Sequence, residues 1–384
     1  LHYPLRRQRQ MCIRDRDESI YEYPMQQGGG NDGRPYSFGR PSSGGSKAAY
    51  PCKSYGQGRI NPAYFYGVFD PNDMRRDVSI TMTGSNGKGV EKLIPFVPNS
   101  KAEGGGLTLN KWDENRQANP WVAAQRKSGI NGPYMRMSEV YLGYAEVCAA
   151  LGDVVTGKQY LKTVRERSFP QGLANTDAFI ASFGNDLVRA IIEERGFEYA
   201  GEGDRRWTLI RSGYLPEDIK RIKDMTKAMM DGLATKGYYE FENGNIISAY
   251  IWTKLVDAKT IYGHRLTAQC PTDKVNDPVL YPGWRGQKDN WEEMGLNYGS
   301  STPATNLAIK GLFEIVSEEE AASLESQGYA KVNWGIDLVD YRDEYDKYLF
   351  WDYDYVSAPI YLWPFTPNVM AAGGFTNGYG FKQE

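Results

Sequence analysis

The residues with the most obvious capacity for chemistry are the acidic and basic side chains gathered between positions 134 and 213. Glu193, Glu194 and Glu198 lie close together on one predicted helix, and paired carboxylates are the usual equipment for acid–base hydrolysis of glycosides. Arginines on the neighbouring predicted helices favour a second interpretation, because opposite charges on adjacent helices form ion pairs. We favour the second interpretation, a structural network of ion pairs between helices, and expect no catalytic residue. The predicted members of this network are Arg136, Glu139, Arg165, Arg167, Glu194, Arg195, Glu198, Glu202 and Arg205.

Histidine and cysteine are too few and too scattered for the common catalytic and metal sites. His2 and His264 are the two histidines of the chain. This scarcity argues against a Ser–His–Asp triad, a histidine-rich metal site and an HExxH helix. The four cysteines show neither zinc-ligand spacing nor a disulfide framework. We therefore expect no metal and no cofactor.

The amino-acid composition indicates which kinds of molecule the protein is expected to bind. The 48 acidic and 45 basic residues give a net charge of −3, which argues against a nucleic-acid partner and a basic membrane-binding patch. Tyr (28) and Trp (9) are abundant, and their flat rings with polar tips suit recognition surfaces as well as cores. No apolar run approaches the roughly 18–20 residues that span a bilayer.

The charged residues must be positioned by helices, because apolar residues recur there at three- and four-residue spacing. A first helix is expected to turn one face inward, made of Met137, Val140, Tyr141, Tyr144, Cys148 and Leu151. Leu161 and Val164 mark a second helix, and Leu187 and Ile191 mark a third. Paired amphipathic helices bury their apolar faces by stacking on neighbours. The sequence therefore predicts a mainly α fold.

The rest of the chain is predicted to be loop-rich around this helical core. The core covers about 134–232, and the part from 233 to 384 is loop-rich. The fold as a whole is expected to contain long irregular loops and a few short strands. The hexapeptide MCIRDR at 11–16 is typical of translated sequencing-adapter sequence. We expect residues 1–16 to be foreign and residues 17–384 to form one domain, with a native N-terminal arm as the alternative.

Four motifs in order resemble the SusD/RagB family of bacterial nutrient-binding lipoproteins. They read YMRMSEVYLGYAEVCAALGD, YLKTVRERS, IIEERGFEYAGEGDRRWTLIRSG and the closing YLWPFTPNVMAAGGFTNGYGF. Thr208 departs from the family pattern, where an aspartate is common. The lipidated cysteine and first helices of the family have no counterpart, so the chain is interpreted as an N-terminally truncated copy.

The resemblance implies a fold and a function. Family members have a tetratricopeptide-like α/α helical-repeat scaffold with long irregular loops. They are lipid-anchored at the outer membrane, on the cell surface, and act as a lid on a SusC-like TonB-dependent transporter. They capture a glycan, less often a peptide, for nutrient uptake without chemistry. The same role is the expectation for this chain.

Aromatic residues in loops are the predicted ligand contacts, because the C–H faces of sugars stack on flat rings. The candidates are Trp112, Trp121, Tyr64 and Tyr66, followed by Trp284, Trp291 and Tyr298. For each, packing in the core is the alternative. Two other functions stay open: a glycoside hydrolase acting through paired carboxylates, and a helical-repeat adaptor that binds protein segments.

Overall fold

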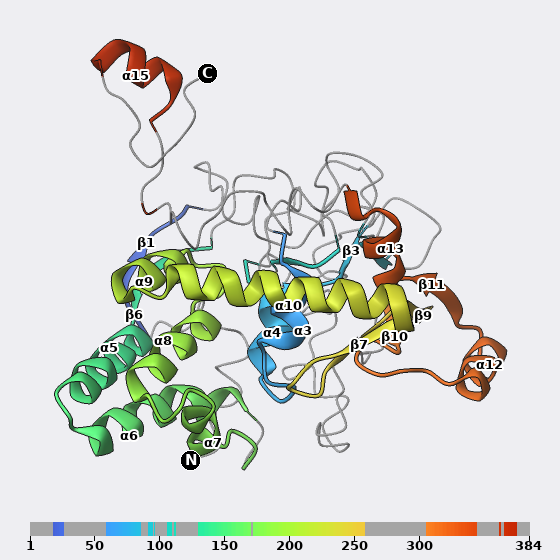
Figure 1. Ribbon diagram of the computed structural model, residues 1–384, viewed down its shortest axis with the longest axis horizontal. Coiled ribbons are helices and arrows are strands. Elements are labelled where there is room, and N and C mark those ends of the chain that lie inside the picture. Colours follow the sequence, from blue (N-terminus) through green and yellow to red (C-terminus); the bar gives the residue numbers. More distant parts are fainter. Residues whose placement is uncertain are drawn as a thin grey trace.

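The computed structural model describes most of the helical core and parts of the chain on either side of it. The described residues are 18–26, 59–85, 91–94, 96, 106–109, 111–112, 130–169, 172–257, 305–343, 361 and 365–374. Helices dominate these residues, and the strands are short, so the predicted mainly α class is confirmed (Figure 1).

Antiparallel helices form one end of the molecule. They are α5 (Met137–Ala150), α6 (Val154–Arg165), α7 (Thr176–Ala181), α8 (Leu187–Glu198) and α9 (Asp204–Ser212), with the 3₁₀ turn η2 (Glu166–Ser168) after α6. Asp153 and Asp186 begin α6 and α8 by accepting hydrogen bonds from backbone amides of the first turn. Gly157 lets α6 lie close to α5, since a Cβ there would sit 3.0 Å from the Ala145 carbonyl oxygen.

The face that α5 turns inward differs from the predicted one. Leu142, Ala145 and Cys148 are buried, and the first two pack with Leu161 and Val164 of α6. Four of the predicted inward residues are exposed instead: Met137 (36%), Val140 (40%), Tyr144 (50%) and Leu151 (82%). The prediction for these four is wrong because α5 has apolar residues on two faces. The face with the smaller side chains is the one packed against α6 and α8.

The long helix α10 (Leu215–Lys236) connects this end to the strands. Figure 1 shows it crossing the molecule from α9 to the hairpin of β7 (Tyr238–Glu240) and β8 (Ile246–Ser248). Beyond the hairpin lies an antiparallel sheet in the order β10-β9-β11. Its strands are β9 (Tyr250–Asp257), β10 (Thr305–Lys310) and β11 (Ala330–Asn333), accompanied by α12 (Glu318–Ser326) and α13 (Gly335–Asp340).

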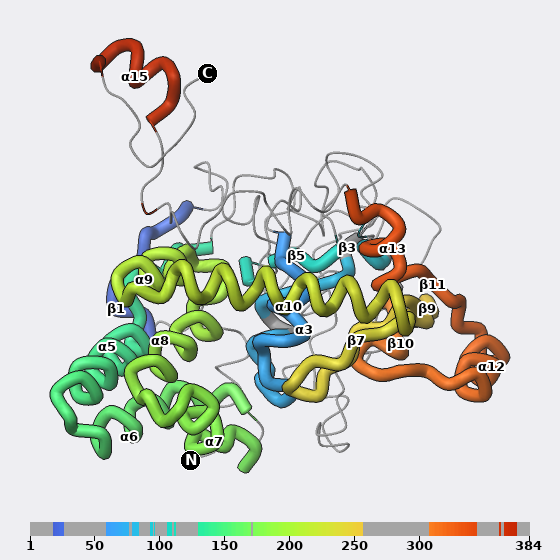
Figure 2. Tube along the Cα trace, viewed as in Figure 1, coloured from blue at the N-terminus to red at the C-terminus, as the bar shows by residue number. Residues whose placement is uncertain are grey.

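The segment before the helical core passes through the centre of the molecule. Figure 2 shows residues 59–85, in blue, near the middle of α10. They contain α3 (Pro62–Gly67), α4 (Met74–Ser79), β2 (Ile80–Thr81) and β3 (Thr83–Ser85), and α3 packs on α10. The remaining elements are β1 (Ser19–Tyr23), β4 (Glu91–Leu93), β5 (Thr108–Leu109), β6 (Gly132–Arg136) and α15 (Pro367–Gly373), with β1 paired to β6, β2 to β5 and β3 to β4.

The largest apolar core joins segments that are far apart in sequence. Phe65 and Tyr66 of α3 pack with Met229 and Leu233 of α10 and with Trp334. The Trp334 Nε1–H donates to the Tyr66 hydroxyl over 2.9 Å, and both side chains are fully buried. Within the described part of the chain, no helix has the length and apolar character to cross a membrane.

Candidate functional site

Two buried carboxylates on α8 collect arginines from three other segments. Glu198 accepts hydrogen bonds from Arg75 (3.1 Å), Arg136 (2.9 Å) and Arg167. Glu194 accepts from Arg75 (2.6 Å) and from Arg165 (2.9 Å). Burial opposes ionisation of Glu198, but its cationic neighbours Arg167, Arg136, Arg75 and Lys111 hold its pKa well below the ordinary value. The α8 carboxylates therefore connect α4, the end of β6 and the end of α6.

A second group of charges extends the same network to α9 and α10. Glu193 accepts from Arg205 (2.8 Å) and Arg221 (2.9 Å), and both arginines also bond Asp218. Burial disfavours the charged form of Glu193, yet these arginines keep the pKa of its carboxyl below the usual value. Each of the nine residues predicted for the network makes at least one ion pair.

The network does not have the properties of an acid–base site. A general acid must carry a proton at the working pH, whereas arginines keep Glu193 and Glu198 ionised. Glu194 is fully buried between two guanidinium groups. The described residues contain no group of His, Cys, Asp and Glu that could hold a metal ion.

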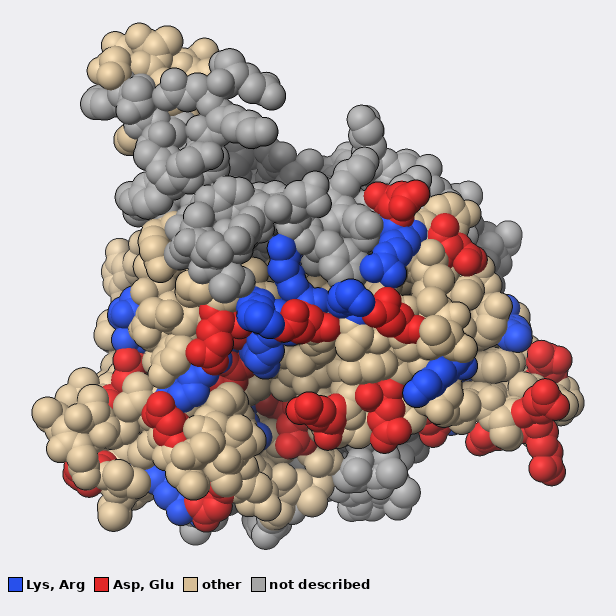
Figure 3. Space-filling view, in the orientation of Figure 1, with Lys and Arg blue, Asp and Glu red and all other residues tan. Residues whose placement is uncertain are grey.

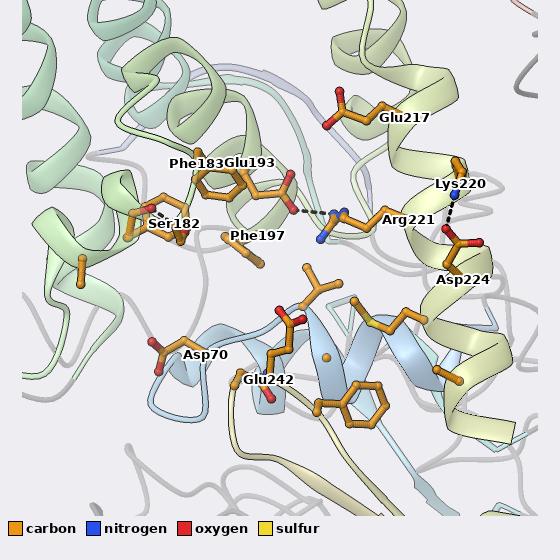
Figure 4. Close-up of a pocket in the computed structure, with 18 of the residues that line it drawn as sticks. Asp70, Ser182, Phe183, Glu193, Phe197, Glu217, Lys220, Arg221, Asp224 and Glu242 are labelled. Carbon is orange, nitrogen blue, oxygen red and sulfur yellow. Dashed lines mark hydrogen bonds and ion pairs between the residues drawn. The ribbon is translucent and has the colours of Figure 1, made fainter. Parts of the chain in front are cut away.

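An open pocket of about 950 Å³ lies beside this network, between α7–α8 on one side and the β7–β8 hairpin on the other (Figure 4). A third side is formed by the first half of α10, which contributes Glu217, Lys220, Arg221, Asp224 and Met225. A volume of this size is typical of small-ligand sites, which span roughly 300–1,000 Å³.

Aromatic rings form two walls of the pocket. On the helical side, Phe179 and Phe183 are half-buried and meet edge to face at 5.3 Å, with Phe197 behind them. On the hairpin side, Tyr239 and Phe241 meet edge to face at 4.8 Å. The half-buried rings of Phe179, Phe183 and Tyr239 provide flat apolar surface to a ligand that enters between the walls, whereas Phe197 and Phe241 are buried behind them.

Local hydrogen bonds hold these walls in place. The Asn175 side chain accepts from the Ala178 amide and begins α7, the short helix that carries Phe179. In the hairpin, the Asn243 amide donates to the carbonyl oxygens of Tyr66 (2.8 Å) and Phe69 (2.7 Å). The hairpin wall is thereby fixed to the central segment.

Charged side chains line the opening of the pocket. Figure 3 shows Asp and Glu side chains around the hollow below α10. In Figure 4, Asp70 and Glu242 lie on the side opposite Glu217. Lys220 is paired to Asp224 on the same helix face. Carboxylates around aromatic walls can accept hydrogen bonds from hydroxyl groups of a ligand while its apolar faces stack.

The predicted ligand residues that the structure describes lie outside this pocket. The loop placement predicted for Tyr64 and Tyr66 is wrong, because Asn61 caps α3 and Pro62 begins it. The Tyr64 hydroxyl donates to the Gly196 carbonyl, and burial raises its pKa to about 12. Tyr66 is fully buried, and Trp112 is 3% exposed with its Nε1–H directed at the Gly201 carbonyl oxygen.

Tyr66 and Trp112 are therefore packed inside the protein, which was the alternative to ligand contact. Neither ring has a face open to a ligand. Trp121, Trp284, Trp291 and Tyr298 lie outside the described residues.

The pocket residues were not predicted from the sequence, although two local signals point to them. Phe179 and Phe183 are four residues apart after an Asn-Thr helix start, the spacing of neighbours on one helix face, although α7 ends at Ala181 and Phe183 lies in the turn after it. Tyr239 and Phe241 alternate before the Asn243-Gly244 turn, the pattern of a hairpin strand with both rings on one face.

A model of the SusD family matches residues 7–365. The chain belongs to the SusD family. The match begins inside the segment 1–16 that we expected to be foreign, and it covers the helical core and the pocket.

Relatives of known sequence or structure resemble parts of the chain. SusD-like protein P25 of Formosa agariphila is 28% identical over 160 residues, 41% of this chain and 26% of that protein. The crystal structure of a SusD homolog from Bacteroides thetaiotaomicron is 20% identical with a TM-score of 0.41, over 58% of this chain and 47% of that one. A laminarin-binding SusD-like protein is 20% identical with a TM-score of 0.38, over 56% and 46%. The chain thus spans less than half the length of each of these relatives.

Proposed function

We propose that this protein captures a glycan at the cell surface without altering it chemically. Membership of the SusD family over residues 7–365 is the observation that carries the proposal. The pocket between α7–α8 and the β7–β8 hairpin supports it, because two aromatic walls and a rim of hydrogen-bonding groups suit sugar rings. The ionised, arginine-paired state of Glu193 and Glu198 favours binding over acid-catalysed hydrolysis.

The wider role in uptake belongs to the same proposal. The full-length protein would be held by a lipid anchor at the outer membrane and would deliver its glycan to a SusC-like TonB-dependent transporter. Copurification of the full-length protein with such a transporter from native outer membranes tests this step. Recovery of the full-length protein in the cytoplasmic fraction would contradict it.

Binding is tested with a panel of polysaccharides in affinity electrophoresis, followed by isothermal titration calorimetry of those that retard the protein. The panel contains neutral laminarin, xylan and amylopectin, anionic alginate and carrageenan, and cationic chitosan. Binding of at least one of them is expected, with no release of reducing sugar on long incubation. Sustained turnover would favour the hydrolase alternative, and failure to bind any glycan would overturn the proposal.

Two sets of variants locate the site. Phe183→Ala and Tyr239→Ala each remove one pocket wall and are expected to weaken binding roughly tenfold, the loss that about 1.4 kcal/mol of stacking produces. Tyr144→Ala, an aromatic half exposed on α5, is the matched control and leaves affinity unchanged.

The remaining sequence-predicted aromatics provide the competing location. Trp121→Ala, Trp284→Ala, Trp291→Ala and Tyr298→Ala test it in the same assay. If these substitutions abolish binding while Phe183→Ala and Tyr239→Ala do not, the glycan site lies outside the pocket.

A further inference from the structure

The cations that line the pocket are already paired within the protein. Arg165 is 3% exposed and donates to Glu194 over 2.9 Å. Arg221 bonds Glu193 (2.9 Å) and Asp218 (2.7 Å). If either arginine turned to bind an anionic ligand, a buried glutamate would lose one of its ion-pair partners. The loss of a partner by a buried charge is strongly unfavourable. Lys220 is more exposed and pairs with Asp224 one turn along α10.

Three carboxylates at the opening are more exposed and less closely paired than the buried network. Glu242 is exposed, and no cation of the described chain lies within ion-pair distance of it. Glu217 is 64% exposed and lies 3.5 Å from Arg189. Asp70 is 37% exposed, accepts a hydrogen bond from the Asn72 backbone amide at 2.8 Å, and lies 3.9 Å from the Arg165 guanidinium.

These carboxylates come from three different segments, so they surround the opening instead of forming one cluster. Asp70 follows α3, Glu242 lies in the β7–β8 turn, and Glu217 occupies the first turn of α10. A ligand that enters between the aromatic walls therefore passes exposed carboxylates on more than one side, and their ion pairs are longer than those of the buried network.

We infer that this pocket selects neutral or amino-bearing glycans and excludes sulfated and uronic-acid glycans. The inference rests on the proposed glycan function and adds the charge class of the ligand. Sugar hydroxyls can donate to Asp70, Glu217 and Glu242, and a protonated sugar amine can form an ion pair with them. A sulfate or carboxylate meets like charge in a partly desolvated site and finds the buried cations occupied.

The test compares charged and neutral forms of the same glycan. The neutral polysaccharide that binds best in the panel is oxidised at its primary hydroxyls to carboxylates, which keeps the backbone and adds negative charge. Wild-type protein is expected to bind the oxidised form roughly tenfold more weakly at low ionic strength, with the difference shrinking as salt screens the charges. Tight binding of alginate or carrageenan, or equal affinity for both forms, would overturn the inference.

A charge-neutralised variant identifies the residues responsible. The triple substitution Asp70→Asn, Glu217→Gln and Glu242→Gln is expected to remove most of the discrimination and its salt dependence. Glu318→Gln, Glu319→Gln and Glu325→Gln on α12 form the matched control, remove the same charge away from the pocket, and leave discrimination as in wild type.

The outcomes separate the two proposals. If a glycan binds but its charge has no effect, the selectivity inference fails and glycan capture stands. If the control triple on α12 changes discrimination as much as the pocket triple, net charge and not the pocket rim is responsible, and the inference also fails. If no glycan binds, both proposals fall.

Discussion

The neighbouring helices α8 and α5 differ in what they expose to solvent: α8 buries charged side chains, and α5 exposes apolar ones. On α8 the charged side chains of Glu193, Glu194, Arg195 and Glu198 are buried, with residue exposures from 0% to 6%. On the outer face of α5 apolar side chains such as Val147 (55%) are exposed, as is Leu151 (82%) at its C-cap. Hydropathy alone would place these two sets the other way round.

The difference follows from what surrounds each helix. α8 is enclosed by α4, α5, α6 and α9, and these together with α10 supply arginines and carboxylates that match its own. A buried charge is tolerated when it is paired and hydrogen-bonded. α5 lies at the edge of the helical layer in Figure 1, and its second apolar face has no covering element among the described residues. Position in the layer, and not residue type, decides burial here.

The largest expected effect comes from breaking the charge balance on α8. Glu198→Ala removes the carboxylate shared by Arg75, Arg136 and Arg167 and leaves two buried guanidinium groups and one half-buried one undercompensated. We expect a loss of about 3–5 kcal/mol in the free energy of unfolding, measured by urea denaturation with circular dichroism. Glu146→Gln, which breaks a more exposed pair with Arg211, is expected to cost about 1 kcal/mol or less. Equal losses of unfolding free energy in the two variants would contradict the expected difference between buried and exposed ion pairs.

Truncating leucines on the two faces of the α5 segment sharpens the comparison. Leu142 is fully buried against α6 and α8, so Leu142→Ala is expected to cost about 2–5 kcal/mol. Leu151→Ala, at the exposed end of the same helix, is expected to stay within about 0.5 kcal/mol of wild type. Similar losses in the same urea assay would mean that the outer face is covered in solution.

Acid should weaken the α8 side of the molecule. The folded-state pKa values of Glu193 and Glu198 lie below their ordinary values, so their contribution to stability is fully present above about pH 4.3, the reference value for an unfolded Glu. It is lost as pH falls below that value through the lowered pKa values. The urea midpoint should therefore be steady in neutral solution and drop below about pH 4.3. A midpoint that rises on acidification would contradict this assignment of charge.

Adding charge to the outer face of α5 should have the smallest effect on stability. Val147→Lys with Leu151→Lys places two cations where the wild-type side chains are 55% and 82% exposed. The free energy of unfolding is expected to change by less than about 0.5 kcal/mol per site. Because contiguous exposed apolar surface promotes association, the variant should self-associate less than wild type in sedimentation velocity experiments. Unchanged sedimentation would show that this face does not drive association.

The sequence predicts the existence of the helices better than it predicts their orientation. Leu161, Val164, Leu187 and Ile191 are all buried as expected, because α6 and α8 each carry one apolar pattern. On α5, Leu142 and Ala145 face the core while Tyr144 and Leu151 face outward. The apolar residues on both faces of α5 have helical spacing, so periodicity alone cannot predict which face is buried.

The charged residues of the helical core did indicate how the helices pack. The spacing of Arg165, Glu194, Arg195 and Glu198 indicates that their helices face one another, and the observed ion pairs have this pattern. The pocket was beyond the reach of the same reasoning. Its walls come from α7, α8, α10 and the β7–β8 hairpin, and their juxtaposition depends on how α10 crosses the molecule. Tyr66 was predicted to contact the ligand because the sequence alone does not distinguish an aromatic residue that packs in a core from one that binds in a loop.

The hydrogen bond between Trp334 and Tyr66 also bears on how the protein folds. The two residues are separated by 268 positions, and both lie in the largest apolar core. During synthesis, the segment that contains α3 emerges long before the tryptophan that completes its surroundings. Contacts of such high sequence separation slow folding, since the loop between them must be closed before they contribute. The helical pairs, whose contacts are local, can form earlier, so the aromatic core is expected to close late.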